Sequence, residues 1–252
     1  GFKAQFGTMG KPLHAGMAAS AGVEAIILAR NGLISSSDGF DGPHGFVATH
    51  QGEQNLDALE GFGKVFLFEQ VSHKFHACCH GSHAMIEAIK KAKSDTIIKP
   101  ESVEKIEITV HPQYLNICNI NKPKTGLEAK FSFSLIAAAV LHGVDTGRLD
   151  VFNENLCKDR EVCALADKVE VITNEGVSET ATKILIKKFN SQIIESYDDI
   201  LTPFKPIDRE GLVRKKAAKL LGFEFSDRIW NMINDDYLTG SKLTKILMHT
   251  PL

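Results

Sequence analysis

One short segment concentrates most of the side chains in this chain that could do chemistry. Residues 74–83 read KFHACCHGSH, with one lysine, three histidines and two adjacent cysteines in ten positions. Histidine and cysteine are the usual ligands of zinc, but structural zinc sites pair their cysteines as C-x-x-C, and two adjacent cysteines do not readily bind one tetrahedral ion. We therefore expect no metal site. Cys78 and Cys79 are better interpreted as small buried residues where a strand meets a helix.

An anion is a more suitable ligand for this segment. The spacing of apolar residues in HAMIEAIKKAK predicts a helix that begins near Gly81. The first N–H groups of a helix have no internal partner and carry the positive end of its dipole. Lys74, His80 and His83 add positive or proton-carrying groups at the same end, which suits a carboxylate or a phosphate. Ordinary surface residues at a helix start are the alternative.

A second lysine and histidine mark another predicted helix start. In GTMGKPLHAG, residues 7–16, Lys11 and His14 flank Pro12, and proline is favoured in the first turn of a helix. The spacing G-x-x-x-x-G-K-[ST] of a phosphate loop is not met. Two such helix starts in one chain favour a site for a small polycarboxylate.

A third stretch, NKPKTGLEAKFSFSL from Asn121, places Lys122, Lys124 and Lys130 around a turn into a helix. Solvated lysines beside an ordinary helix explain them equally well. The motifs of three other enzyme classes are absent from the sequence: the G-x-S-x-G elbow of hydrolases, the dinucleotide fingerprint and the H-E-x-x-H of zinc peptidases.

The composition limits the classes of partner and the compartment that we expect. The chain has 252 residues, 43% of them hydrophobic and 24% charged, with a formal net charge of −2. This balance gives no reason to expect nucleic acid or an anionic membrane as partner. The longest uninterrupted apolar run, LIAAAVL from Leu135, is too short to cross a bilayer. Five cysteines, two of them adjacent, favour a reducing compartment, so we expect the cytoplasm, or the mitochondrial matrix if the source is eukaryotic.

Several elements must position these groups. The helix from Pro12 stops at Asn31–Gly32 and carries a stripe of alanines and glycine that predicts close packing against another helix. A loop over 35–45 follows, and from about residue 63 the pattern becomes that of a small α/β sandwich. Its predicted elements are strands over 65–71 and 103–112, helices over 83–93, 130–143 and 161–166, and a hairpin of strands 168–174 and 181–189.

The last part of the chain is helical in pattern. A helix from Asp208, expected as its N-cap, closes at Gly222, and one or two more helices follow between residues 226 and 248.

Three segments together resemble one family. GTMGKPLHAGMAASAGVEAIILARNG, KFHACCHGSHAMIEAI and GLEAKFSFSLIAAAVLHG are similar, in order and spacing, to the MmgE/PrpD family, which includes 2-methylcitrate dehydratase, cis-aconitate decarboxylase and iminodisuccinate epimerase. Members are longer, and this sequence resembles their second part. The Asp and His that the family carries on its N-terminal helices are not in this sequence, so we expect an incomplete site in this chain alone.

The resemblance implies an α+β fold: an all-helical domain, here partial, with an inserted smaller α/β lid domain. On that template residues 1–62 and 205–252 belong to the helical domain and residues 63–204 form the lid, with the active site between them. The family works as a homodimer.

The resemblance also implies roles for individual residues. Lys11 and Lys74 would bind substrate carboxylates and stabilise the charge that develops on them. His14 and His80 would orient the substrate or transfer protons, while His83 and Lys130 would bind substrate, His83 alternatively being only a buried residue of the helix start. No metal or organic cofactor is implied.

The expected function is therefore a cofactor-independent lyase that acts on a small di- or tricarboxylic acid by proton transfer at carbon. Dehydration of 2-methylcitrate, a step of propionate catabolism, is the first choice, and iminodisuccinate epimerase and cis-aconitate decarboxylase are the alternatives within the family. The decarboxylase is disfavoured because its tyrosine has only Tyr114 as a counterpart.

Phe75 and His76 stand where members often have Pro or Tyr, and His76 could change which acid fits. From another class, a non-catalytic carboxylate-binding fragment or partner subunit fits the incomplete site.

Overall fold

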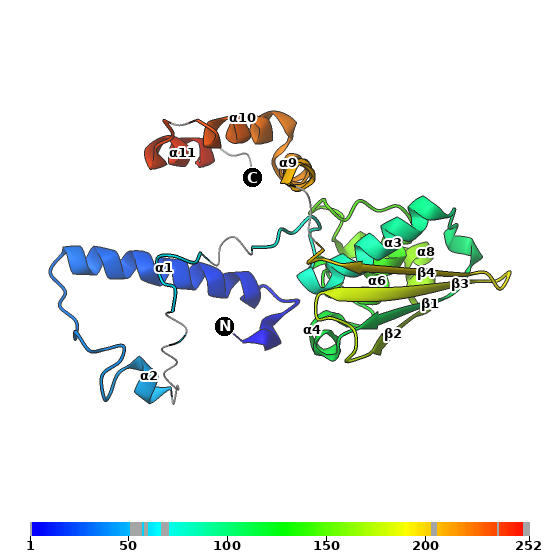
Figure 1. Ribbon diagram of the computed structural model, residues 1–252, viewed down its shortest axis with the longest axis horizontal. Helices are drawn as coiled ribbons and strands as arrows, with labels where there is room; N and C mark the ends of the chain where they lie inside the picture. Colours follow the sequence, from blue (N-terminus) through cyan, green and yellow to red (C-terminus); the bar gives the residue numbers. More distant parts are fainter. Residues whose placement is uncertain are drawn as a thin grey trace. The chain divides into compact units, whose positions relative to one another are not determined.

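The computed structural model describes residues 2–50, 57, 60–66, 71–202, 206–235 and 237–248. They fall into two compact units, one of residues 10–71 and one of residues 2–9 together with 72–252. Within the described ranges there are eleven α-helices and one four-stranded mixed sheet, which agrees with the predicted α+β class (Figure 1). The predicted division into a partial helical domain and an inserted lid stays a prediction.

The first unit is built around one long helix, α1 (Gly10–Arg30), followed by turns and the four-residue α2 (Phe46–Thr49). The predicted stop of α1 is confirmed: the Asn31 N–H donates to the Ile27 carbonyl, and Gly32 has φ +91°, a conformation that glycine adopts without strain. The predicted strand over 65–71 lies largely outside the described residues, and its described positions 65, 66 and 71 are not in a strand.

The expected packing of α1 against another helix is not found within this unit. No described residue of α1 is buried, and large apolar side chains such as Leu13 and Met17 are exposed, because the other described parts of the unit are turns and the short α2. By length and composition alone α1 could cross a membrane, a test that core helices of soluble proteins and signal sequences also pass. The expectation of no membrane partner stays a prediction.

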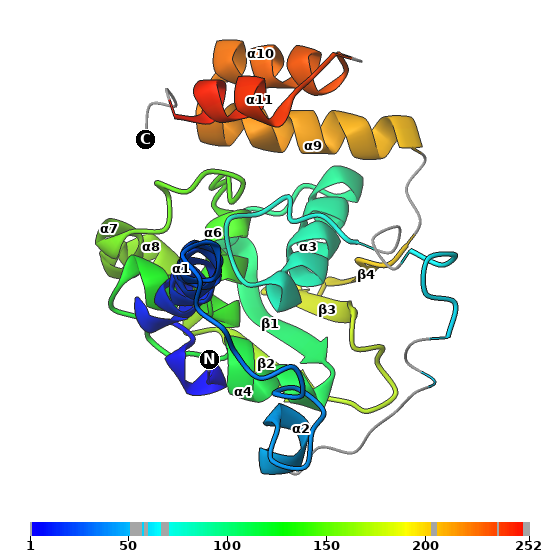
Figure 2. The same cartoon turned by 90° about the vertical axis from the view of Figure 1, so that its left-hand side faces the viewer.

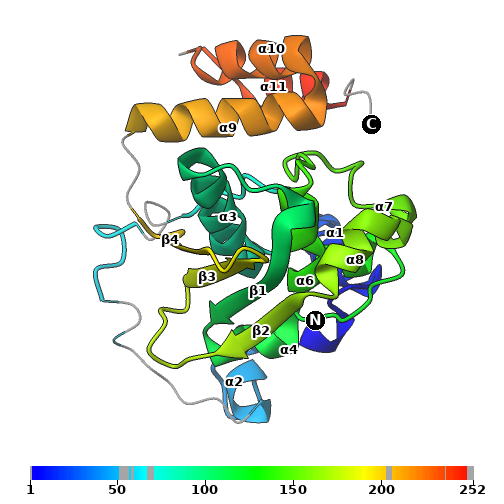
Figure 3. The ribbon, with the colours of Figure 1, turned by 90° about the vertical axis from the view of Figure 1, so that its right-hand side faces the viewer.

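The second unit contains the sheet, in the order β2–β1–β3–β4 (Figure 3). Its central strand β1 (Val103–Val110) runs parallel to β2 (Val169–Thr173) and antiparallel to β3 (Ala181–Lys188), and β3 pairs in turn with β4 (Ile193–Asp199).

The predicted hairpin of the second and third strands is therefore wrong. β1 lies between β2 and β3 and buries Val103, Ile106, Ile108 and Val110 on one face. The chain between β1 and β2 contains five α-helices and one 3-10 helix, which gives it the length that a parallel crossover needs. The true hairpin joins β3 to β4, a strand that the sequence pattern did not predict.

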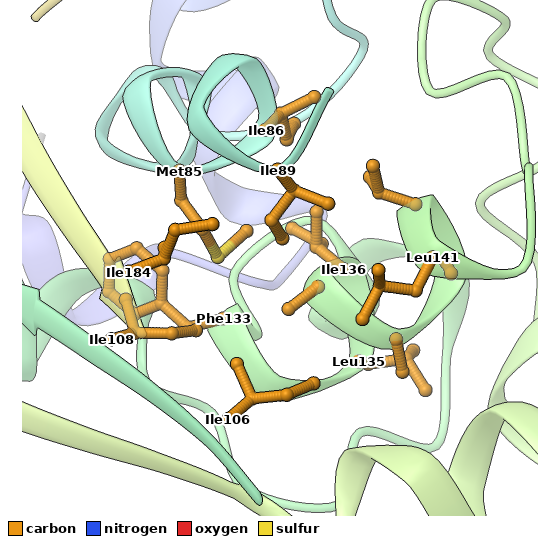
Figure 4. Packing of buried hydrophobic residues seen from close by; sticks show 14 of the residues in the cluster. Met85, Ile86, Ile89, Ile106, Ile108, Phe133, Leu135, Ile136, Leu141 and Ile184 are labelled. Carbon is orange, nitrogen blue, oxygen red and sulfur yellow. The ribbon is translucent and has the colours of Figure 1, made fainter. Parts of the chain in front are cut away.

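Two helices cover one face of this sheet: α3 (His83–Asp95) packs on β3 and β4, and α6 (Phe133–Leu141) packs beside it toward β2 (Figure 1). Both helices and β1 were predicted from the apolar spacing, and the structure confirms them. Each large side chain buried here contributes about 1.5–3 kcal/mol. The fully buried core between these helices and the sheet includes Met85, Ile86, Ile89, Ile106, Ile108, Phe133, Ile136 and Ile184 (Figure 4).

The opposite face of the sheet carries paired charges. Lys105 contacts Glu170 at 2.5 Å across β1 and β2, and Lys187 contacts Glu104 at 2.8 Å across β3 and β1. Such exposed pairs contribute at most about 1 kcal/mol each. They mark this face as solvated.

The remaining elements connect or follow the sandwich. α9 begins at Pro206, so Asp208 lies in its first turn and is not its N-cap as predicted. The predicted stop at Gly222 is confirmed by its φ of +80°, and two further helices follow, with α10 packed on α9 (Figure 2). The bounds are η1 (Lys3–Gln5), η4 (His80–Ser82), η5 (Pro100–Ser102), η6 (Pro112–Tyr114), α4 (Leu115–Cys118), α5 (Gly126–Ala129), α7 (Glu154–Lys158), α8 (Arg160–Ala166), α9 (Pro206–Leu221), α10 (Phe223–Ile233) and α11 (Gly240–Leu247).

Candidate functional site

The lysine- and histidine-rich segment leads directly into α3 through the 3-10 turn η4. Helical backbone thus starts at His80, one residue before the predicted Gly81. Glycine is required at this start, because a Cβ on Gly81 would lie 2.5 Å from two ring carbons of Tyr114. The absence of a side chain lets Tyr114 close one side of the segment.

His83 lies at the first position of α3 and is only 2% exposed. Its ring lies 5.0 Å from the His80 ring and 4.9 Å from the His76 ring, between centroids. Burial, together with the charges of His76, His80 and Lys74, lowers the pKa of His83 to about 2. His83 is therefore neutral at physiological pH, and its Nε2 has no hydrogen-bond partner among the described residues.

His80 is the more accessible of the two histidines of the helix start. Its Nε2 lies 3.4 Å from the Ser72 hydroxyl. Burial and the charge of Lys74 lower its pKa below the ordinary value, so the imidazole is neutral at pH 7 and can accept a proton.

His76 is held inside the protein at both ring nitrogens. Its Nε2 lies 2.6 Å from a Glu87 carboxylate oxygen and its Nδ1 lies 2.7 Å from the Thr146 hydroxyl. Burial lowers the pKa of His76. Burial alone would raise the pKa of Glu87, but the hydrogen bond from His76 and the charge of Lys90 lower it to about 2. His76 is thus held in a buried hydrogen-bond network and is not free to contact the substrate acid. The sequence had suggested instead that His76 could change which acid fits.

Two of the predicted lysines lie at this segment. The Lys74 ammonium donates to the Cys78 carbonyl at 3.4 Å, and the Lys130 carbonyl accepts from the Cys79 N–H at 2.9 Å. The charges of Lys74 and Lys130 also act on the Cys78 thiol, whose pKa burial raises to about 12. No carboxylate of the described residues lies within 4.0 Å of either ammonium.

Lys74, His80, His83 and Lys130 are thus brought together, and we call them the α3 cluster. Among the described residues its cations have no paired acids, and its histidines are neutral, an arrangement that suits an anionic ligand and a proton acceptor. Lys11 and His14 belong to the first unit, where Lys11 is exposed and His14 is partly exposed near the start of α1. Their participation stays a prediction.

The cysteines support a structural interpretation. Cys78 is buried and Cys79 is partly buried, and Cys79 interacts with the buried Cys118. Within the parts of the chain that the structure describes, no three His, Cys, Asp or Glu side chains converge as metal ligands would.

A separate groove of about 660 Å³ lies between the loop 121–125, the start of α6, and helices α7 and α8. Three lysines line it: Lys122, Lys124 and Lys158. Lys122 lies 3.9 Å from Asp167 and Lys158 lies 2.8 Å from Glu154. Because carboxylates of the groove pair with two of its three lysines, the groove is a poorer site for a polyanion than the α3 cluster.

Sequence reasoning missed three groups that surround the cluster: Glu87, Thr146 and Lys216. Glu87 lies one turn after His83 in the predicted helix, and this spacing was its only signal. Thr146 and Lys216 come from parts of the chain that only the tertiary fold brings to residues 74–83.

No curated protein matches the chain. The family model of the MmgE/PrpD C-terminal domain matches residues 76–216, more than half of the 252 residues. The matched range contains three residues of the α3 cluster and ends at Lys216, while Lys74 precedes it by two positions. Since this range covers the whole sheet with α3 and α6, the chain belongs to the MmgE/PrpD family.

Proposed function

We propose that the chain is a lyase that acts on a small di- or tricarboxylic acid by proton transfer at carbon, without a metal or organic cofactor. The family includes dehydratases and lyases. The observation that carries the proposal is the α3 cluster, in which Lys74 and Lys130 lack carboxylate partners among the described residues and stand beside two neutral histidines. Dehydration of 2-methylcitrate is the reaction that we propose first.

Each group has a role in this reaction. Lys74 and Lys130 bind carboxylates of the substrate and stabilise the negative charge that grows on them as the proton leaves carbon. The neutral His80 accepts that proton, and the electron pair of the broken C–H bond forms the alkene. The hydroxyl group leaves from the next carbon and takes up a proton to become water. Lys11 and His14 are proposed to complete the carboxylate contacts and the proton transfer.

The alternatives begin with the same binding step and differ in the product. An epimerase returns the proton to the opposite face of the carbon. A decarboxylase releases carbon dioxide from cis-aconitate, the electron pair of the broken C–C bond shifts the double bond, and a proton adds to carbon. A non-catalytic chain binds the acid and changes nothing. The product therefore distinguishes all four functions.

Proton NMR in D₂O tests the proposal. The protein is incubated in turn with 2-methylcitrate, citrate, cis-aconitate and iminodisuccinate. With 2-methylcitrate we expect loss of the signal of the C–H next to the methyl group, and collapse of the methyl doublet to the singlet of a methyl group on an alkene carbon. Lys74→Gln should slow this change about 100-fold or more. Lys99→Gln, which changes an exposed lysine beyond the C-terminal end of α3, is the matched control and should leave the rate unchanged.

Two results would overturn it. Turnover that is equal in wild type and Lys74→Gln would remove the α3 cluster from the chemistry. Binding of an acid without any change in its spectrum would instead make the chain a carboxylate-binding subunit.

We also propose that the protein is a cytoplasmic homodimer, as the resemblance to the family implies. Sedimentation velocity should give about twice the chain mass of 27.6 kDa. A single species at the chain mass over a wide concentration range would contradict the dimer.

A further inference from the structure

One lysine of helix α9, Lys216, lies close to the α3 cluster. The Lys216 ammonium donates to the Gly147 carbonyl at 2.9 Å, whereas the neighbouring Lys215 is exposed. One turn further, Lys219 forms an ion pair with Asp145 at 2.7 Å. Both contacts fall on residues 145–147, so α9 is anchored to this loop at two points.

The same loop supports the segment that carries Lys74. The Thr146 carbonyl accepts from the Ala77 N–H at 2.7 Å, and the Thr146 hydroxyl lies 2.7 Å from His76 Nδ1. The Cys78 carbonyl, which accepts from Lys74, is one residue beyond Ala77. Lys216 and Lys74 therefore donate hydrogen bonds to two backbone segments that lie side by side, and the two ammonium groups repel each other electrostatically.

The charges at this place do not balance. Asp145 is paired with Lys219, and no carboxylate of the described residues lies within 4.0 Å of Lys74, Lys130 or Lys216. All three ammonium groups act electrostatically on the buried Cys78 thiol. Three like charges around one point repel one another, and an anion with several carboxylates would relieve that repulsion.

A second observation points to the same ligand. His83 is 2% exposed, and its Nε2 lacks a hydrogen-bond partner within the described residues. A buried polar atom of this kind usually has a partner, which in a binding site can be the ligand. Because the neutral ring is hydrogen-bonded to the Cys78 backbone through its other nitrogen, Nε2 is an unused acceptor near Lys74, which suits a hydroxyl group of a hydroxy acid.

We propose that Lys216 is a substrate-binding residue and that, with Lys74 and Lys130, it selects a tricarboxylate over a dicarboxylate. This inference rests on the proposed function, because it concerns the same site. Three separate ammonium groups match three carboxylates, and a dicarboxylate leaves one of the lysines without an anion.

Binding of unreactive acids tests the inference apart from catalysis. Isothermal titration calorimetry compares propane-1,2,3-tricarboxylate with glutarate on the full chain. Wild type should bind the tricarboxylate more tightly, and Lys216→Gln should weaken that binding about 10-fold while changing glutarate binding less than about 3-fold. Lys215→Gln, the adjacent exposed lysine, should leave both affinities unchanged.

Two further variants separate binding from docking of α9. Lys216→Arg keeps the charge and should retain most of the selectivity. Lys219→Gln removes the other anchor of α9 and should retain tricarboxylate binding. If Lys219→Gln loses as much affinity as Lys216→Gln, Lys216 acts only by holding α9, and the inference is wrong.

The remaining outcomes distinguish the two proposals. If Lys74→Gln abolishes tricarboxylate binding but Lys216→Gln behaves like Lys215→Gln, the role of Lys216 is overturned and the proposed site stands. If Lys216→Gln weakens both acids equally, its role in selecting a tricarboxylate is overturned. If wild type binds neither acid, the proposed function fails as well.

Discussion

His83 shows how burial changes what a histidine can do. The sequence suggested a proton-carrying group at a helix start, but burial and the neighbouring positive charges lower its pKa to about 2. At neutral pH the ring can donate one hydrogen bond and accept one, and it supplies no charge. The cationic part of the α3 cluster is therefore carried by its lysines.

The low pKa of His83 makes stability depend on pH. Below about pH 6.5 the unfolded chain binds a proton at this histidine and the folded chain does not, so acidification costs about 1.4 kcal/mol per pH unit for this group. His83→Gln should therefore lose less stability than wild type between pH 6.5 and 4.5. Glu87, with its pKa of about 2, adds a further loss only below about pH 4.5.

Urea unfolding at several pH values measures this effect. Burial raises the pKa of Asp198 to about 6, which acts in the opposite sense, so the difference between variant and wild type is the quantity to compare. His73→Gln, at an exposed histidine just before the segment 74–83, is the control and should follow wild type. A difference between His83→Gln and wild type that does not change with pH would contradict a neutral, buried His83.

The hydrogen bond of Thr146 gives a second prediction for a single residue. Its hydroxyl is the partner of His76 Nδ1 at 2.7 Å, and both residues are buried. Thr146→Val keeps the shape but leaves the ring nitrogen without a partner, which should cost about 1–3 kcal/mol of unfolding free energy. Thr109→Val, on the solvated face of β1, should change it by less than about 0.5 kcal/mol. Equal effects in the two variants would mean that the hydrogen bond contributes nothing.

Gly81 sets the contact between two elements, η4 and η6. Gly81→Ala places a Cβ 2.5 Å from the Tyr114 ring and should destabilise the protein by about 1–3 kcal/mol. The cost should fall by at least about 1 kcal/mol in a Tyr114→Ala background, which a double-mutant cycle measures by chemical denaturation.

Gly211→Ala is the matched control for this helix-start glycine. It lies inside α9 with open space around its Cβ position, so the same substitution should stabilise the helix by about 0.5–1 kcal/mol. If Gly81→Ala costs the same with and without the Tyr114 ring, the close contact is not the reason for glycine here.

The helices and strands also show which features of the fold can be predicted from the sequence. The helix from His83 and the strand from Val103 were predictable because their apolar residues repeat with the period of one buried face. The pairing of β2 with β1 was not, because a short turn between β2 and β3 looks like a hairpin whether or not another strand lies between them. β4 was missed because ESYDD within it lacks apolar alternation and the strand is exposed at the sheet edge.

At the scale of the molecule, the two units should differ in local stability. β1 is the central strand of the sheet with fully buried side chains, whereas α1 has no buried residue among those described. Hydrogen exchange at low protein concentration should therefore be slowest in β1 and close to that of an isolated helix in α1. Protection of α1 equal to that of β1 would mean that something covers this helix.

From residue spacing alone, the site was predictable only where its residues are neighbours in the sequence, and Lys130 was predicted to bind substrate only through the family resemblance. Lys74, His80 and His83 lie within ten residues of a helix start, and that spacing alone suggested an anion. Lys130, Thr146 and Lys216 come from other parts of the chain. They form hydrogen bonds with the Cys79 backbone, the His76 ring and the Gly147 backbone, which lie 51, 70 and 69 residues away in the sequence, respectively. Such contacts cannot be predicted from the spacing of residues within one segment.

The central claim is that the α3 cluster binds a polycarboxylate, and amide NMR of the ¹⁵N-labelled chain tests it most directly. During titration with propane-1,2,3-tricarboxylate, the amides of residues 79–84 and of Lys130 should shift and saturate together. The amide signals of Lys122, Lys124, Cys157 and Lys158, which line the separate groove, should not shift. Shifts confined to the groove, with residues 79–84 unmoved, would contradict the site proposed for this protein.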